Sequence, residues 1–211
     1  MAFELLTWNS QGAKWGEVWN AVKQRRPAVF CLQECGVPPD YGFKKFATGT
    51  FGTYWSATYN GYYIFYCEWL YAVNRRCDLA ILSQTKTSSF YSESNYRPMI
   101  GLEIEPGKFA FTLHAPASNQ AAEYNKTLLI QGIRRLAKQP SAWICAGDFN
   151  CEPKAMASPA HWRVIASANP TQQSGGVLDY AVYAGQLQVG YQGAVGTLVS
   201  DHYGQAFSVS W

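Results

Sequence analysis

The sequence predicts an α+β protein in which two β-sheets pack face to face, with helices on the outside. Short apolar runs recur along the whole 211-residue chain, as expected for strands that are buried on at least one face. Helical periodicity is confined to a few segments. In addition, 48% of the residues are hydrophobic and 16% are aromatic, which is enough for a well-buried core. Many strands with few helices are typical of a sandwich of sheets.

The individual elements follow from local patterns. Strands are expected where apolar residues dominate a short segment, at residues 3–8, 28–32, 62–67, 79–82, 99–104, 109–113, 143–146, 178–182 and 206–209. Helices are expected at residues 16–26, where Val18, Trp19 and Val22 lie on one side, and at residues 121–138 and 161–168. No Pro/Ser-rich or charge-rich linker divides the chain, so residues 1–211 are expected to form a single domain.

Charge and cysteine content exclude few classes of protein. Seventeen basic and fourteen acidic residues give a net charge of +3, too small to require a nucleic-acid partner by itself. No apolar run approaches the ~20 residues that span a bilayer, and residues 3–8 are expected to be a core strand rather than part of a signal peptide. Of the six cysteines, Cys31 and Cys145 are expected to be buried thiols, whereas Cys67 and Cys77 could close a hairpin.

Four short polar motifs lie next to expected strands. Asn9 follows the first strand, Gln33-Glu34 follows the second, and Gly147-Asp148-Phe149-Asn150 follows residues 143–146. The fourth motif, Ser200-Asp201-His202, precedes the last strand. Strand ends at one edge of a sheet are close in space, so these motifs are expected to line one pocket.

Three of these side chains are candidate ligands for a divalent cation. Mg²⁺ prefers oxygen ligands and takes one or two carboxylates while it keeps waters and substrate phosphate. Glu34 fits as the anchoring carboxylate, with Asn9 and Asp201 nearby. The sequence therefore predicts a Mg²⁺ site, in which Mn²⁺ could replace Mg²⁺; Ca²⁺ is a further candidate as a structural ion.

Two of the three histidines are expected at strand ends. His114 directly follows the strand expected at residues 109–113, and His202 follows Asp201. His161 has no acidic neighbours and is expected to be structural. A histidine that is held by a carboxylate is a suitable general base. Asp179 is an acid within an apolar segment, and a buried carboxylate needs a partner, so it is expected to pair with His202.

Taken together, the four motifs resemble the endonuclease/exonuclease/phosphatase superfamily, which includes deoxyribonuclease I, and they occur in the order found in that superfamily. Further stretches are similar to the catalytic component of cytolethal distending toxins, namely residues 76–83, 97–101, 111–115 and 174–182. The similarity runs from about Phe3 to the last strand and therefore covers essentially the whole chain.

The resemblance implies a four-layer α/β/β/α sandwich and Mg²⁺-dependent cleavage of DNA. It implies that Glu34 is the main metal ligand, supported by Asn9 and Asp201. Asp148 and Asn150 would position the attacking water and the phosphate. The other implied roles are an acid–histidine pair for Asp179 and His202, a second catalytic histidine for His114, and phosphate contacts for Arg76 and Arg97.

The resemblance also implies a secreted toxin that acts inside a target cell and is delivered by partner subunits; a cytoplasmic protein is the alternative.

Three other functions remain open. A phosphoinositide phosphatase on the same core would need a compact basic pocket for a headgroup, whereas DNA cleavage needs a groove that follows the backbone. A catalytically silent toxin-assembly module would not need the full set of acids and histidines. A cysteine hydrolase would use Cys31 or Cys145, yet both are expected within strands, where a thiolate is not favoured.

Overall fold

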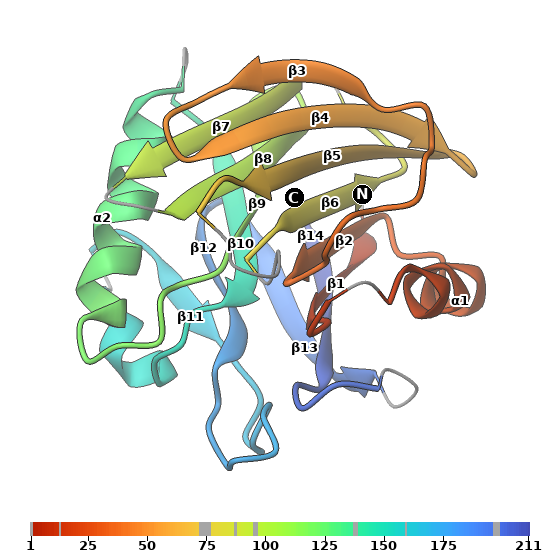
Figure 1. The fold of residues 1–211 in the computed structure, drawn as a ribbon. Helices are drawn as coiled ribbons and strands as arrows, with labels where there is room; N and C mark the ends of the chain where they lie inside the picture. The colour runs from red at the N-terminus through yellow and green to blue at the C-terminus, as the bar shows by residue number, and fades with distance from the viewer. Residues whose placement is uncertain are drawn as a thin grey trace.

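The structure is a computed structural model that describes residues 2–12, 14–71, 77–86, 88–94, 97–136, 139–158, 160–195 and 199–211. Figure 1 shows how its elements are arranged. In chain order they are β1 (Ala2–Asn9), α1 (Trp15–Arg25), β2 (Val29–Gln33), β3 (Lys44–Thr48), β4 (Gly52–Tyr59), β5 (Tyr62–Trp69), β6 (Leu79–Ser83), β7 (Ser88–Ser94), β8 (Arg97–Glu105), β9 (Lys108–Leu113), α2 (Ala121–Arg134), β10 (Ala142–Asp148), the 3-10 helix η2 (Pro153–Met156), β11 (Arg163–Ile165), β12 (Asp179–Gly185), β13 (Gln188–Val195) and β14 (Gly204–Ser210).

The strands form two mixed sheets. Within the described residues, the first sheet has eight strands in the order β13-β14-β1-β2-β6-β5-β4-β3, and the second has six in the order β11-β12-β10-β9-β8-β7. Near the middle of each sheet lies a parallel pair, β1 with β2 and β9 with β10. A parallel pair needs a crossover connection. Here α1 connects β1 to β2, and α2 lies between β9 and β10.

Three apolar layers hold the two sheets and the two helices together. Leu5 of β1 packs in one cluster with Ile100 of the second sheet. Its neighbour Leu6 points the other way and packs with Val18 of α1. Leu128 of α2 packs in a third cluster with strands of the second sheet, and Figure 1 shows α1 and α2 on opposite sides of the sheets. The protein is therefore a four-layer α/β/β/α sandwich, which confirms the predicted fold class.

The expected strands are all present, with bounds shifted by at most three residues. Two of the expected helices are found as α1 and α2; α2 ends at Arg134, and residues 137–138 lie outside the described part of the chain. Strands β3, β4, β7, β11 and β13 are not among the predictions. Because α1 and α2 cover the outer faces of the central strands, these strands are buried on both sides, which explains their nearly continuous apolar sequences.

The helix predicted at residues 161–168 is wrong. Arg163–Ile165 form β11, which pairs antiparallel with β12. The preceding Trp162 is buried against Trp143, with ring centroids 6.3 Å apart, and its Nε1 donates to the carbonyl of Met156 at 2.8 Å. Strand pairing and burial of this large side chain outweigh a weak local preference for helix.

Four of the six cysteine thiols are buried, three of them in strands. Cys31 and Cys145 are free and fully buried, as predicted. Cys67 is also a buried free thiol, so the bridge to Cys77 that the sequence allowed is not formed.

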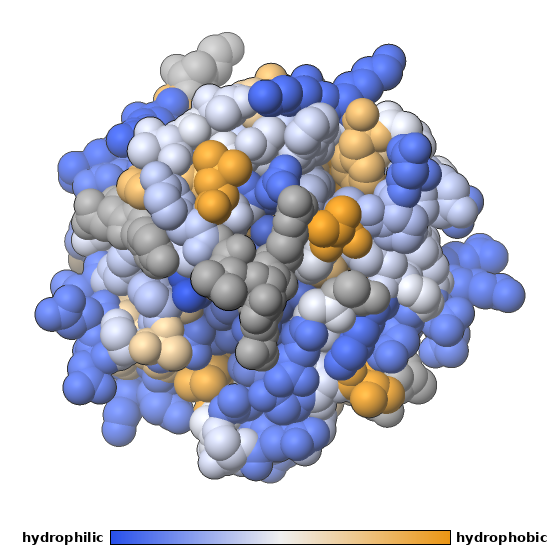
Figure 2. All heavy atoms as spheres, in the orientation of Figure 1, coloured by the Kyte–Doolittle hydropathy of each residue, from blue (hydrophilic) through white to orange (hydrophobic). Residues whose placement is uncertain are grey.

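The face of the molecule seen in Figure 2 is mainly hydrophilic, with hydrophobic side chains in small separate patches. In the part of the chain that the structure describes, no helix combines the length and the apolar character needed to cross a bilayer.

Candidate active site

The ends of β1 and β2 bring Asn9 and Glu34 together. The two strands are parallel, with Asn9 opposite Gln33. Beyond the strands, the N–H of Gly12 donates to the carbonyl of Glu34 at 2.6 Å, which ties the two turns to each other. Glu34 has a φ of 48°, a left-handed conformation that costs a non-glycine residue about 1–3 kcal/mol. Asn9 Nδ2 donates to Glu34 Oε1 at 3.2 Å.

The ends of β9 and β10 bring His114 and Asp148 together in the second sheet. The two residues form a parallel backbone bridge, and the N–H of Ala115 donates to the carbonyl of Asp148 at 3.0 Å. Asn150, at a φ of 48°, closes this turn. Its N–H donates to Asp148 Oδ1 at 2.9 Å and its Nδ2 donates to the carbonyl of Ala115 at 2.7 Å. Asn150 therefore fixes both the carboxylate of Asp148 and the backbone beside His114.

Asp179 and His202 are directly hydrogen-bonded. Asp179 begins β12, where it lies opposite Asp148 in the antiparallel pair with β10. His202 precedes β14, and its N–H donates to Ser200 Oγ at 3.1 Å, while that hydroxyl donates to the carbonyl of Asn9 at 2.8 Å. His202 Nδ1 lies 2.8 Å from Asp179 Oδ2. Asp179, the buried carboxylate that is expected from the sequence to pair with His202, therefore does so.

Most of these groups line one hollow of about 380 Å³. Asn9 and Asp179 are not among the lining residues; they are buried and contact the lining residues Asp148 and His202, respectively. Asp148 lies close to three of these side chains: its Oδ2 is 2.9 Å from Asn9 Nδ2, 3.5 Å from His114 Nε2 and 3.9 Å from His202 Nε2. His114 Nε2 is also 3.7 Å from Glu34 Oε1. The described lining consists of Gln11, Glu34, Cys77, Arg97, His114, Ala117, Asp148, Asn150, Gln172, Asp201 and His202. The four motifs thus meet in space, as the sequence predicts.

Arg97 lines the same hollow from the start of β8. Its Nη1 donates to the carbonyls of His114 and Ala115 at 3.2 and 2.8 Å, and its guanidinium lies over the ring of Trp69, 5.3 Å from the ring centroid. Arg97 therefore supports the backbone that carries His114 and lines the hollow. Arg76, the other predicted phosphate contact, lies outside the described residues.

Burial and mutual charge control protonation in the hollow. Burial, together with the charge of Asp179, raises the pKa of Asp148 to about 7. Burial lowers the pKa of His202, but the hydrogen bond and charge of Asp179, helped by Asp148 and Asp201, outweigh it and raise that pKa to about 9. Without a bound cation, His202 is therefore protonated near neutral pH and partly balances the surrounding carboxylates.

The donor atoms at the hollow fit a hard divalent cation. Glu34, Asp148 and Asp201 all present carboxylates to it. Oxygen donors of this kind are the ligands that Mg²⁺ prefers. Carboxylates that lie close together repel one another unless protons or a cation compensate them. The pKa of Asp148 is raised first by burial and then by the charge of Asp179, and a bound cation would offset both effects.

A second arrangement of possible ligands overlaps this one. Among the described residues, Asp148, Asp179 and His202 offer atoms that all lie within 4.8 Å of one another. However, Asp179 Oδ2 already accepts from Thr171 at 2.9 Å and faces His202 Nδ1 at 2.8 Å. These two contacts occupy Asp179 Oδ2, whereas the side chains of Glu34 and Asp201 are 13% and 36% exposed and are better placed for an ion.

Sequence reasoning missed Thr171, Gln11 and Gln172. Thr171 is fully buried and donates to Asp179, yet it lies in a polar loop with no motif, so no local pattern marks it. Gln11 and Gln172 line the hollow. Gln11 could have been found, because it lies two residues after Asn9 and its N–H donates to Asn9 Oδ1 at 3.2 Å.

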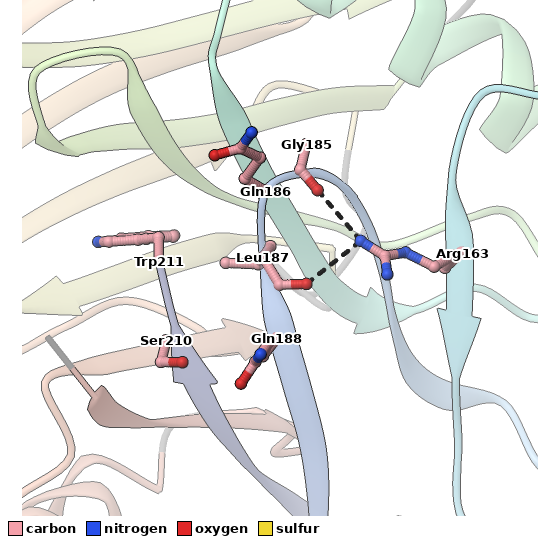
Figure 3. Close-up of a pocket in the computed structure, with 7 residues that line it drawn as sticks. All are labelled: Arg163, Gly185, Gln186, Leu187, Gln188, Ser210 and Trp211. Atoms are coloured by element: carbon pink, nitrogen blue, oxygen red, sulfur yellow. Dashed lines mark hydrogen bonds between the residues drawn. The ribbon is translucent and has the colours of Figure 1, made fainter.

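Another hollow lies at the β12–β13 turn and the end of β14 (Figure 3). Arg163 donates through Nη2 to the carbonyls of Gly185 and Leu187 at 3.1 and 3.2 Å. Neither a carboxylate side chain nor a histidine is among its described lining residues. Since its one arginine already binds backbone, this hollow does not have the groups for phosphate chemistry.

The fold and the site together define the class of protein. The family model for the endonuclease/exonuclease/phosphatase family matches residues 6–202, and the chain belongs to this family. It is accordingly an enzyme that hydrolyses phosphoric esters.

Within the family, the chain is similar to cytolethal distending toxin proteins. It is 28% identical to a Salmonella typhi homolog of the B component of cytolethal distending toxin over 244 aligned residues, which cover 97% of this chain and 88% of that protein. The fold matches that of CdtB, described as the biologically active subunit of cytolethal distending toxin, with a TM-score of 0.74, 22% identity and coverage of 97% and 96% of the two chains. It also matches the Haemophilus ducreyi cytolethal distending toxin with a TM-score of 0.72, 23% identity and 97% coverage of each chain.

Proposed function

We propose that the chain is a Mg²⁺-dependent phosphodiesterase that cleaves DNA as an endonuclease. The observation that supports this most directly is the convergence of Glu34, Asp148, Asp201 and two histidines on one hollow. A cation site flanked by an acid–histidine pair is suited to in-line displacement at phosphorus.

Glu34 is the proposed anchoring ligand of the cation, with Asp201 as the second carboxylate and Asn9 in support. Because Asn9 Oδ1 accepts from the N–H of Gln11, its Nδ2 faces Glu34 and Asp148 and orients their carboxylates. When bound, Mg²⁺ neutralises the negative charge of the phosphate oxygens. Mn²⁺ suits the same oxygen donors, and we propose Ca²⁺ only as a structural ion.

The acid–histidine pair is proposed to activate water. His202 directs Nε2 towards the hollow, because Nδ1 is held by Asp179 at 2.8 Å. In its neutral form this Nε2 takes a proton from the attacking water, and the carboxylate of Asp179 stabilises the resulting imidazolium. Asp148 and Asn150 position the water and the phosphate.

The remaining groups act on the leaving side. His114 Nε2 is proposed to donate a proton, or a hydrogen bond, to the departing oxygen. Arg97 is proposed to contact a phosphate oxygen from the rim of the hollow. Arg76 is proposed for the same role. A guanidinium offers a forked donor that a lysine does not replace.

DNA is favoured over a phosphoinositide because of the charges at the hollow. A headgroup with several phosphates requires several cations around it. Among the described lining residues, Arg97 is the one lysine or arginine, and the same lining includes three carboxylates. Even with Arg76 in the role proposed above, two guanidinium groups would share the hollow with three carboxylates. This composition is better suited to a cation-assisted diester with one phosphate. A phosphoinositide phosphatase remains the second candidate function, since it would use the same acids and histidines.

We also propose how the enzyme is used. By analogy with the relatives named as toxin components, the chain acts as a secreted toxin inside a target cell and is delivered by partner subunits; a cytoplasmic location is the alternative. Residues 1–211 are proposed to act as one catalytic domain.

The test is a side-by-side assay of supercoiled-plasmid nicking and inositol-lipid dephosphorylation, each with Mg²⁺ and with EDTA. We expect nicking that requires Mg²⁺ and falls about 10²–10⁴-fold in His202→Ala and His114→Ala. His161→Ala is the matched control, because His161 contacts Ser158 in a turn and is not a lining residue of the hollow. Dephosphorylation without nicking would favour the phosphoinositide phosphatase. If both histidine variants kept the wild-type rates of nicking and dephosphorylation, the catalytically silent toxin-assembly module would be favoured.

A further inference from the structure

Thr171 connects three segments of the site. It is fully buried in the loop between β11 and β12. Its carbonyl accepts from the N–H of Tyr203 at 2.8 Å, and the adjacent Gln172 forms an antiparallel bridge with His202. Its side chain reaches in the other direction, to the start of β12. One residue therefore touches both the strand end that carries Asp179 and the turn that carries His202.

The Thr171 hydroxyl accepts two hydrogen bonds and donates one. Oγ1 accepts from the backbone N–H groups of Leu178 and Asp179 at 2.8 and 2.9 Å. A hydroxyl has two lone pairs and one proton, so with both lone pairs engaged its proton must point to another acceptor. That acceptor is Asp179 Oδ2, at 2.9 Å.

Asp179 Oδ2 thus accepts from two side chains at once. His202 Nδ1 lies 2.8 Å away on the same oxygen. Among the described groups, the other oxygen, Oδ1, is buried without a hydrogen-bond partner, so the two contacts at Oδ2 set the orientation of the carboxylate. The hydrogen bond from Thr171 therefore fixes the oxygen that His202 Nδ1 contacts.

We infer that Thr171 is a positioning residue: it fixes the Asp179 carboxylate and thereby holds His202 with Nδ1–H towards Asp179 and Nε2 towards the hollow. The expected effect of Thr171 on kcat rests on the proposed function. The placement of the His202 ring can be tested without it.

The test compares Thr171→Val, which keeps the shape but removes the hydroxyl, with Thr171→Ser, which keeps the hydroxyl. In metal-free protein labelled with ¹⁵N-histidine, the Nδ1–H signal of His202 is expected to be shifted or lost by exchange in Thr171→Val and retained in Thr171→Ser. With Mg²⁺ and DNA, we expect kcat to fall about 10–100-fold in Thr171→Val, with KM nearly unchanged. This is the range typical of replacing a residue that hydrogen-bonds to a site residue. The matched control is Thr53→Val, a buried threonine in β4.

Several outcomes would overturn the inference. An unaltered Nδ1–H signal in folded Thr171→Val would do so, even if the protein cleaved no DNA at all. Failure of Thr171→Ser to restore the signal would have the same meaning. If Thr171→Val does not fold, Thr171→Cys, whose thiol is a weak donor of similar size, takes its place with the same expected shift.

Discussion

Asp148 shows how the surroundings of a single residue decide its chemistry. In the sequence it is one acid in Gly147-Asp148-Phe149-Asn150. In the structure it is buried, faces Asp179 across two paired strands and lies within 4 Å of a nitrogen of both His114 and His202. Its pKa is raised to about 7 because of this burial and the second carboxylate. The residue type follows from the motif, and the protonation follows from the neighbours.

The Asp179–His202 pair makes stability depend on pH in the metal-free protein. The pKa of His202 is raised from 6.5 to about 9 in the folded state, so the stability it contributes is fully present below pH 6.5 and is lost as pH rises through 9. We expect the free energy of unfolding, measured in urea with EDTA, to decline over pH 6.5–9. Asp179→Asn should flatten this decline because it removes the main group that raises the pKa; an equally steep decline in that variant would contradict the assignment.

The register of β9 and β10 sets the geometry of the catalytic edge. The two strands are parallel in pairs up to Cys145 and Phe111, and the bridge between His114 and Asp148 continues the pairing beyond them. Gly147 lies between the last pair and the bridge, with its backbone packed closely on Leu113. A Cβ at this position would lie 2.3 Å from the carbonyl oxygen of Leu113, which is part of the strand and cannot rotate away.

Gly147→Ala is therefore expected to separate the ends of β9 and β10. We expect a loss of stability of about 1–3 kcal/mol from overpacking, together with a loss of activity as His114 and Asp148 move apart. Gly16→Ala in α1 is the control, since nothing lies within 4 Å of its added Cβ and alanine favours helix. Urea unfolding and plasmid nicking measure the two effects; normal activity in Gly147→Ala would show that the strand ends tolerate this displacement.

The two-sheet architecture explains why the site has contributions from both halves of the chain. The first sheet supplies Asn9 and Glu34, and the second supplies His114, Asp148 and Asp179. The apolar interface between the sheets holds these edges side by side. Cys31 lies in that interface, where its Sγ donates to the carbonyl of Phe111 at 3.7 Å.

The same burial argues against Cys31 or Cys145 as a nucleophile. Burial raises the pKa of the Cys31 and Cys145 thiols, which disfavours the thiolate that such a reaction needs. Cys31→Ala and Cys145→Ala are expected to keep the wild-type nicking rate, with a stability loss of ~1 kcal/mol each, comparable to deleting a buried methylene. A 100-fold loss of rate in a variant that unfolds normally would restore the cysteine mechanism.

The amino-acid sequence by itself determined the central strands, the two long helices and the four polar motifs. It could do so because apolar periodicity is local and because strands covered on both faces are strongly apolar. It did not reveal β3 or β13, whose exposed residues give no such pattern, and it misassigned β11, which pairing with β12 decides.

The tertiary structure alone decided which polar groups share protons and which hold them in place. Thr171 lies 31 residues before His202 in a loop without a motif, and Asp148 comes from a different strand than Asp179. Their contacts exist because two sheets and a loop meet at one edge, and no local sequence pattern records distances between segments so far apart. Residue chemistry was determined locally, whereas orientation and protonation required the packed molecule.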